Sequence, residues 1–317
     1  MGKLSKVKTF IQSKLYSPKP NTFEAYYNSG VDAYSKQDYE KAIKYFKLAI
    51  EQEGVRPQVY YNLALTYQCM KEYDRAILAY NKFLEANPED YDGLYNIALT
   101  YSKHGNYLKA IEYFKTCMEM RSEDAVIKGL VYAYLGNNEV QNAFDIALKV
   151  LENNKNGIDF FYELAKIFES KNPQNKDFTL IDKAIEMYMK ILERDVKYFD
   201  AYLSISICFA KKGEWEMSVE FCNKALEMNP KSYEANSQMG LVYYCCDETK
   251  KAINYFEIAL KLKPVGDYKV YSNLAYAYEK IGQYDKAVKI FTKLINKFPQ
   301  FPAKDEVKNH LRVLKTL

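Results

Sequence analysis

The sequence predicts an all-α protein made of stacked helix pairs, and three observations lead to this fold class. Similar residues return at intervals of about 34 residues, apolar residues within each interval recur at three- and four-residue steps, and proline closes several intervals. Such steps place apolar side chains on one face of a helix, and a single helix pair cannot bury both of its faces. We therefore expect the pairs to stack in one elongated array.

The first two repeats show the pattern that the others follow. Six characteristic residues of the first repeat are Tyr26, Gly30, Tyr39, Ala42, Phe46 and Ala49, and the second repeat has Tyr60, Ala64, Tyr73, Ala76, Tyr80 and Phe83 at the same places. Small residues at the eighth and twentieth places let the two helices of a repeat approach closely, and the bulky residue at the twenty-fourth fills the space beside them. The predicted repeats, in order, are residues 23–56, 57–90, 91–123, 124–157, 158–198, 199–232, 233–266 and 268–301.

The later repeats keep this register with local changes. Their second helices carry the small residues Ala110, Ala143, Ala184, Ser218, Ala252 and Ala287. Pro88, Pro230, Pro264 and Pro299 close repeats, because proline cannot continue the preceding helix but fits the first turn of the next. The fifth repeat has about seven extra residues in the polar run 172–179, which predicts an enlarged loop between its helices.

These residues and their spacing resemble the tetratricopeptide repeat, which places one helix pair in each period of about 34 residues. The resemblance extends from residue 23 to residue 301. It implies a right-handed superhelical solenoid of about eight helix-turn-helix repeats, in which the first helix of each pair lines a concave groove.

The two ends of the chain lie outside the repeats. Residues 1–22 are predicted to form a basic amphipathic leader, in which Lys3, Lys6, Lys8 and Lys14 would contact a membrane or a partner. A cap over the first repeat and a partly disordered arm are the alternatives. Residues 302–317 are predicted to form a C-terminal capping helix, because solenoids need an end with a wetter outer face.

Composition excludes several classes of protein. The 317 residues contain no run of eighteen apolar residues, so no transmembrane helix is expected. The six cysteines have no metal-ligand or disulfide-framework spacing, which favours a reducing compartment and hence the cytoplasm. The leader carries five lysines and no acid, so the rest of the chain has a net charge of about −1. This nearly neutral part of the chain lacks the clustered positive charge that nucleic-acid binding requires.

The sequence offers no enzymatic chemistry. It contains no glycine-rich phosphate loop, no zinc-protease motif and no nucleophile elbow, and the repeats with their two ends account for the whole chain. Its two histidines, His104 and His310, lie far apart in the sequence. We expect no catalytic residue, no metal site and no cofactor.

The resemblance implies a peptide-binding groove, because the fifth, sixth and ninth places of the first helix meet ligand in this family. Those places carry Tyr27, Asn28, Val31, Tyr61, Asn62, Leu65, Tyr95, Asn96 and Leu99 in the first three repeats, and Gln238 and Asn273 restore the amide in the last two. The row of amides resembles the asparagine ladder of the O-GlcNAc transferase repeat domain, which holds an extended peptide by its main chain. An amide can donate to a peptide carbonyl and accept from a peptide N–H. Hydrogen bonding between neighbouring repeats is the alternative role of these asparagines.

A second feature of the family is missing. Chaperone-binding members hold a terminal carboxylate with a lysine at the fifth and an asparagine at the ninth place of one repeat. Tyr27 and Val31 stand at those places here, and Asp92 lies where the third repeat would face the carboxylate. The carboxylate clamp for Hsp70 and Hsp90 is therefore absent.

The sequence thus predicts a non-enzymatic scaffold for protein–protein interaction, which binds an extended peptide or a partner helix in its concave groove. The first alternative is a peripheral-membrane assembly or secretion factor that its basic leader localises. The second is a regulatory subunit of an enzyme carried on another chain.

Overall fold

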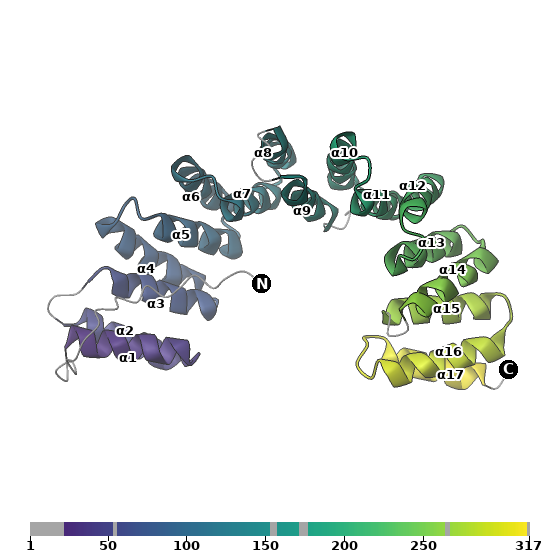
Figure 1. Cartoon of the computed structure of the whole chain (residues 1–317). Helices are drawn as coiled ribbons and strands as arrows, with labels where there is room; N and C mark the ends of the chain where they lie inside the picture. Colours follow the sequence, from purple (N-terminus) through teal and green to yellow (C-terminus); the bar gives the residue numbers. More distant parts are fainter. Residues whose placement is uncertain (1–21, 53–55, 153–156, 171–176, 264–266, 316–317) are drawn as a thin grey trace. The chain divides into compact units, whose positions relative to one another are not determined.

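A computed structural model of the chain describes residues 22–52, 56–152, 157–170, 177–263 and 267–315. The leader, with Lys3, Lys6, Lys8 and Lys14, lies outside the described residues, as does most of the polar run in the fifth repeat. The described residues form seventeen α-helices, so the predicted all-α class is confirmed (Figure 1). Packing divides the chain into two compact units, residues 1–156 and 157–317.

Unit 1 holds eight helices that alternate between the first and second helix of a repeat (Figure 1). They are α1 (Phe23–Ser35), α2 (Tyr39–Ile50), α3 (Gln58–Cys69), α4 (Tyr73–Ala86), α5 (Tyr91–His104), α6 (Tyr107–Met120), α7 (Asp124–Gly136) and α8 (Val140–Glu152). Side chains of Thr22, Asp38, Asp90 and Asn106 accept hydrogen bonds from backbone N–H groups in the first turns of α1, α2, α5 and α6. These caps satisfy donors that have no partner inside the helix.

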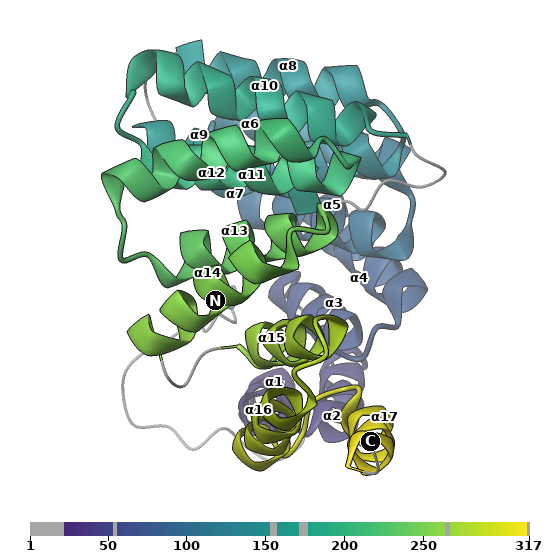
Figure 2. The ribbon, with the colours of Figure 1, turned by 90° about the vertical axis from the view of Figure 1, so that its right-hand side faces the viewer.

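Unit 2 continues the alternation and ends on one additional helix, which packs beside α16 (Figure 2). Its helices are α9 (Gly157–Ser170), α10 (Thr179–Arg194), α11 (Phe199–Lys212), α12 (Trp215–Met228), α13 (Tyr233–Cys245), α14 (Thr249–Leu262), α15 (Tyr268–Lys280), α16 (Tyr284–Lys297) and α17 (Lys304–Leu314). Helix α17 buries Val307, Leu311 and Leu314 in the cluster of apolar residues that it shares with α15 and α16.

Small residues allow the close packing inside each unit. A Cβ atom added to Gly30 would lie 2.5 Å from the ring of Phe46, and one added to Gly240 would lie 2.6 Å from the ring of Phe256. Contacts between real Cβ atoms and other heavy atoms are not this short. As long as the phenylalanine ring at the twenty-fourth place keeps its position, the eighth place of these two repeats accepts only glycine.

The first helices of neighbouring repeats also contact each other, as α5 contacts α7 and α11 contacts α13. Second helices of neighbouring repeats do not pack to a comparable extent in the described part of either unit. Within each unit the first helices therefore lie closer together and form the inner side of the curve. We call this surface the inner face.

Candidate functional site

The structure divides the predicted peptide-binding residues into a buried and an accessible group. The buried side chains are Tyr27, Tyr61, Asn62, Leu65, Asn96 and Gln238. Those that are exposed or half-buried on the first helices are Asn28, Val31, Tyr95, Leu99 and Asn273. Only the second group offers atoms to a ligand without a change in the packing of the repeats.

The buried amides join one repeat to the next. Asn62, which is 1% exposed, donates from Nδ2 to the hydroxyl of Tyr27 at 2.9 Å. Asn96 donates in the same way to the hydroxyl of Tyr61 at 2.9 Å, and also to the backbone oxygen of Asp92 at 2.7 Å. The tyrosine at the fifth place of one repeat thus accepts from the amide at the sixth place of the next. We call this contact the inter-repeat pair.

A third pair occurs in unit 2 with a different polar residue. Tyr162 and Ser204 stand at the fifth and sixth places of successive repeats, and their hydroxyls share a hydrogen bond of 3.0 Å. Between the third and fourth repeats the pattern stops at Gly129, where an added Cβ atom would lie 2.5 Å from the ring of Phe114. The interruption that the sequence shows at this place therefore has a steric cause.

Gln238 shows what happens to the sixth place when the tyrosine is missing. The preceding repeat carries Leu203 at the fifth place, and a leucine offers no acceptor. The Nε2 atom of Gln238 is buried and makes no hydrogen bond in the described structure. A buried donor without a partner destabilises a fold, so this amide has lost the role that Asn62 and Asn96 have.

Tyr27 and Tyr162 stay protonated at neutral pH. Burial raises the pKa of Tyr27, and the hydrogen bond from Asn62 and the charge of Arg56 offset only part of this rise. Burial likewise raises the pKa of Tyr162, again with a smaller opposing effect from its hydrogen-bond partner, Ser204. The pairs of these two tyrosines are therefore contacts between neutral groups and do not change over the physiological pH range.

The ninth place of the first helices carries an aliphatic or aromatic side chain in seven of the eight repeats, and Lys166 stands there in the fifth. The ninth place, predicted as Val31, Leu65 and Leu99 in the first repeats, is Tyr132 in the fourth, Leu241 in the seventh and Tyr276 in the eighth. The last three are exposed large side chains, with exposed fractions of 48%, 37% and 36%. These three residues are not among the predicted contacts, although the ninth place, followed through all repeats of the sequence, includes them.

Two shallow hollows lie on the first helices or beside them. One has a volume of about 420 Å³, and its lining includes Asn28 and Asp32 of α1. The other, about 410 Å³, lies in unit 2 and is lined by Tyr244, Tyr276, Glu279, Lys280 and Tyr284. Both combine aromatic and charged side chains, which suits contact with a peptide better than enclosure of a small molecule.

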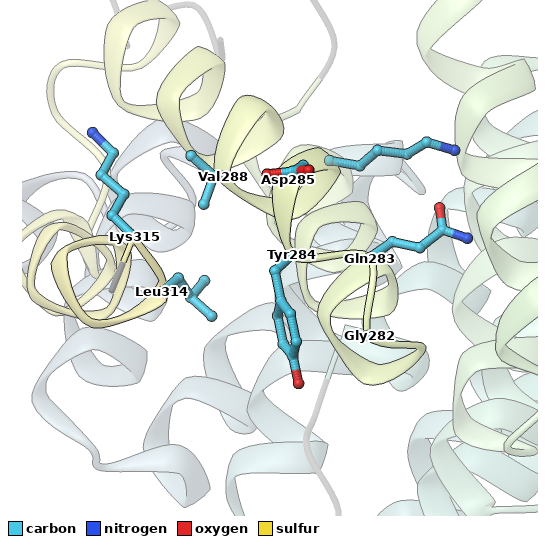
Figure 3. Close-up of a pocket in the computed structure, with 8 residues that line it drawn as sticks. Gly282, Gln283, Tyr284, Asp285, Val288, Leu314 and Lys315 are labelled. Carbon is cyan, nitrogen blue, oxygen red and sulfur yellow. The ribbon is translucent and has the colours of Figure 1, made fainter. Parts of the chain in front are cut away.

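A larger pocket of about 630 Å³ lies at the end of unit 2, between the start of α16 and the end of α17. Figure 3 shows Tyr284 and Val288 on one side of it and Leu314 and Lys315 on the other. None of its lining residues belongs to the predicted groove. The chain is also too open here to bury a ligand on all sides, because no further helix covers α17 within the described residues.

The described residues contain no cluster of three or more histidine, cysteine or acidic side chains that could hold a metal ion. Burial raises the pKa of Cys117, Cys208 and Cys222 to about 12, so these thiols are unreactive at neutral pH. His310 pairs with Glu279 at 2.8 Å and lies against the rings of Tyr276 and Phe291. Its place is therefore a packing contact of the terminal helix. None of the described helices is both long and apolar enough to cross a membrane.

Comparison with known proteins identifies the repeat. Models of the tetratricopeptide repeat match residues 23–54 and 199–232, 57–90, 79–112 and 270–300. No curated protein matches the sequence.

Among solved structures, one described as "Crystal structure of MamA" is 26% identical, covers 53% of this chain and 94% of its own, and has a TM-score of 0.43. "Crystal structure of YrrB: a TPR protein with an unusual peptide-binding site" is 20% identical, covers 61% of this chain and 95% of its own, and has a TM-score of 0.37. "MamA RS-1 ArsTM double mutant" is 16% identical over 55% of this chain and 93% of its own, with a TM-score of 0.44.

Proposed function

Because this chain belongs to the tetratricopeptide repeat family, we propose that it is a non-enzymatic interaction scaffold that binds an extended peptide or a partner helix along its inner face. The observation that supports this most directly is the apolar ninth place, which gives the inner face of each unit accessible large side chains. Aromatic and aliphatic anchors of this kind carry most of the binding energy at protein interfaces.

In unit 1 the proposed contacts are the accessible members of the predicted set. Val31 and Leu99 supply apolar surface, Tyr95 supplies an aromatic ring, and the exposed amide of Asn28 can donate to and accept from a peptide main chain. Asn62 and Asn96 hold the helices in register through their pairs with the preceding tyrosines. Such a fixed frame reduces the conformational entropy lost on binding.

The test uses a displayed library of random linear peptides, selected against the full chain. The inner-face variant is Val31→Asp with Leu99→Asp. The matched control is Leu78→Asp with Leu108→Asp, because these leucines are on second helices and are each 67% exposed. Selected peptides should bind the inner-face variant at least roughly tenfold more weakly. Binding would bury the charge of each introduced aspartate against apolar groups of the peptide, which costs more than about 1.4 kcal/mol in binding free energy.

The control variant should keep the wild-type dissociation constant within about twofold, the range expected for a substitution outside an interface. Circular dichroism of both variants checks that the helices remain folded. Equal losses in the two variants, or no loss in the inner-face variant, would remove the support for this groove.

We also propose that the scaffold works in the cytoplasm, because all six cysteines are free thiols. Two other functions have separate readouts. A factor localised by its leader would lose membrane association when residues 1–22 are deleted, and a regulatory subunit would co-purify with an enzymatic activity.

A further inference from the structure

The C-terminal end of unit 2 has a net positive charge, whereas the rest of that unit has a net negative charge. Residues 280–315 contain nine lysines and arginines and three acidic residues, whereas residues 157–279 contain more acidic than basic residues. Four of the lysines lie on the second helix of the eighth repeat, at three- and four-residue steps: Lys286, Lys289, Lys293 and Lys297. We call this row the basic strip. It runs over twelve residues of α16, or about 16 Å.

The strip faces away from the packed core. Helix α16 buries Ala287, Phe291 and Leu294, while all four lysines are exposed. The ammonium of Lys286 lies 5.1 Å from the ring centroid of Tyr278, and that of Lys297 lies 3.0 Å from the hydroxyl of Tyr271. Both tyrosines belong to α15, so the strip runs along the flank of α16 that adjoins the first helix of its own repeat.

In three other repeats a lysine at one of these four places pairs with a glutamate at another. The third repeat pairs Lys109 with Glu112 at 2.8 Å, the fifth pairs Lys183 with Glu186 at 3.2 Å, and the sixth pairs Lys224 with Glu220 at 2.6 Å. The glutamate stands in each case where the eighth repeat has Lys289. The first repeat also lacks this glutamate and has Lys41 and Lys44 at the first two places, but Leu48 and Gln52 stand at the other two.

Without that glutamate, the eighth repeat keeps its full positive charge. No carboxylate of the described residues lies within ion-pairing distance of Lys289 or Lys293. Like charges at such steps on a helix repel each other, so the row destabilises α16 slightly unless an external anion is present.

We propose that the basic strip binds the surface of an anionic lipid bilayer. Its four side chains are all lysines, whose compact, strongly hydrated charges respond to a diffuse negative surface and lack the planar fork with which arginine holds a single phosphate or carboxylate. The pocket at this end is lined by Lys286 but by none of the other three lysines of the strip.

The neighbouring second helix supports the same partner. The equivalent places on α14 carry Lys251, Asn254, Ile258 and Leu262, and Leu262 is 37% exposed. Lys251 pairs with Glu248, so at these places α14 contributes the exposed leucine and no unpaired charge. An exposed leucine on this helix and unpaired lysines on α16 match the interface of a bilayer, which offers anionic headgroups above an apolar layer. A nucleic acid offers phosphates but no such layer, and its binding is one outcome of the test below.

The experiment measures co-sedimentation of the full chain with vesicles of phosphatidylcholine containing phosphatidylserine, and with vesicles of phosphatidylcholine alone. The strip variant is Lys289→Gln with Lys293→Gln, since neither lysine supports a packing contact. The matched control is Lys41→Gln with Lys44→Gln on α2, which removes the same charge from two exposed lysines at the corresponding second helix of unit 1. The leader is unchanged in both variants, so its contribution cancels.

The wild type should bind only the anionic vesicles and lose binding at high salt, because ions screen the attraction. A lysine near an anionic surface contributes about fivefold to partitioning, so the strip variant should bind roughly 30-fold more weakly and the control within about twofold. Equal binding of strip variant and wild type, or equal losses in both variants, would overturn the proposal. A wild type that ignores vesicles but binds a phosphate polymer such as single-stranded RNA would also overturn it.

Discussion

Asn96 and Gln238 stand at the sixth place of their repeats, and we expect opposite effects when each is replaced by leucine. Asn96→Leu removes two buried hydrogen bonds, one to the Tyr61 hydroxyl at 2.9 Å and one to the Asp92 backbone oxygen at 2.7 Å. A net contribution of about 0.5–1.5 kcal/mol for each bond gives a loss of about 1–3 kcal/mol in the free energy of unfolding.

Gln238→Leu removes no hydrogen bond from its Nε2 atom, because that donor has no partner. The leucine instead puts an apolar side chain at this buried place and removes the desolvation cost of an unpaired amide. We expect the free energy of unfolding to stay unchanged or to rise by about 1 kcal/mol.

The assay is urea denaturation of the full chain, followed by circular dichroism, with amide hydrogen exchange to locate each change. Exchange should become faster in α3 and α5 for Asn96→Leu and should not become faster in α11 and α13 for Gln238→Leu. If the two substitutions lower the unfolding midpoint equally, the inter-repeat pairs do not stabilise the stack and this account of the sixth place is wrong.

Three further predictions concern packing, backbone and thiols. Ala76→Leu should lower the free energy of unfolding by about 1–3 kcal/mol, because Ala76 is fully buried and the larger side chain overpacks its site; an unchanged melting temperature would contradict the register. Lys71 has a positive φ of 63°, and Gly105, at the same place of the next repeat, has a φ of 86°. Lys71→Gly should therefore raise the melting temperature, because it relieves about 1 kcal/mol of backbone strain. A lower melting temperature would show that the lysine side chain contributes more than the strain costs. In a titration with a thiol reagent at pH 8, exposed Cys69 and Cys245 should react at once. The buried thiols, whose pKa burial raises to about 12, should react only after unfolding, and early reaction would contradict the packing: Cys117, Cys208 and Cys222.

The fold could be predicted from the sequence because periodicity alone determines it. Apolar residues at three- and four-residue steps specify a helix, and the return of small and aromatic residues specifies which helices pack together. The close contact between Gly30 and Phe46 shows this directly, since both residues belong to the repeated pattern. The all-α class and the repeat family are confirmed for this reason.

The roles of the asparagines could not be predicted in the same way. The sequence shows an amide at the sixth place, but it does not show the distance from that amide to the tyrosine of the preceding repeat. Only the stacking of α1 on α3 places the Tyr27 hydroxyl 2.9 Å from Asn62. Burial of these amides likewise depends on how the repeats stack. Asn28 and Asn62 are identical residues at equivalent places, yet Asn28 is exposed and Asn62 is buried.

The difference in burial yields a final prediction about the predicted amide row. A peptide that bonds to Asn96 must first break that amide's bonds to Tyr61 and Asp92, so the exchange of hydrogen bonds yields little net affinity. Exposed Asn28 exchanges only its bonds with water. Asn28→Ala should therefore weaken the binding of a selected peptide by about 0.5–1.5 kcal/mol, while Asn96→Leu changes the dissociation constant less once the folded fraction is taken into account. Fluorescence anisotropy with a labelled peptide measures both. A larger effect of Asn96→Leu on the folded protein would mean that the ligand displaces the inter-repeat pair, and the amide row would then bind main chain across adjoining repeats.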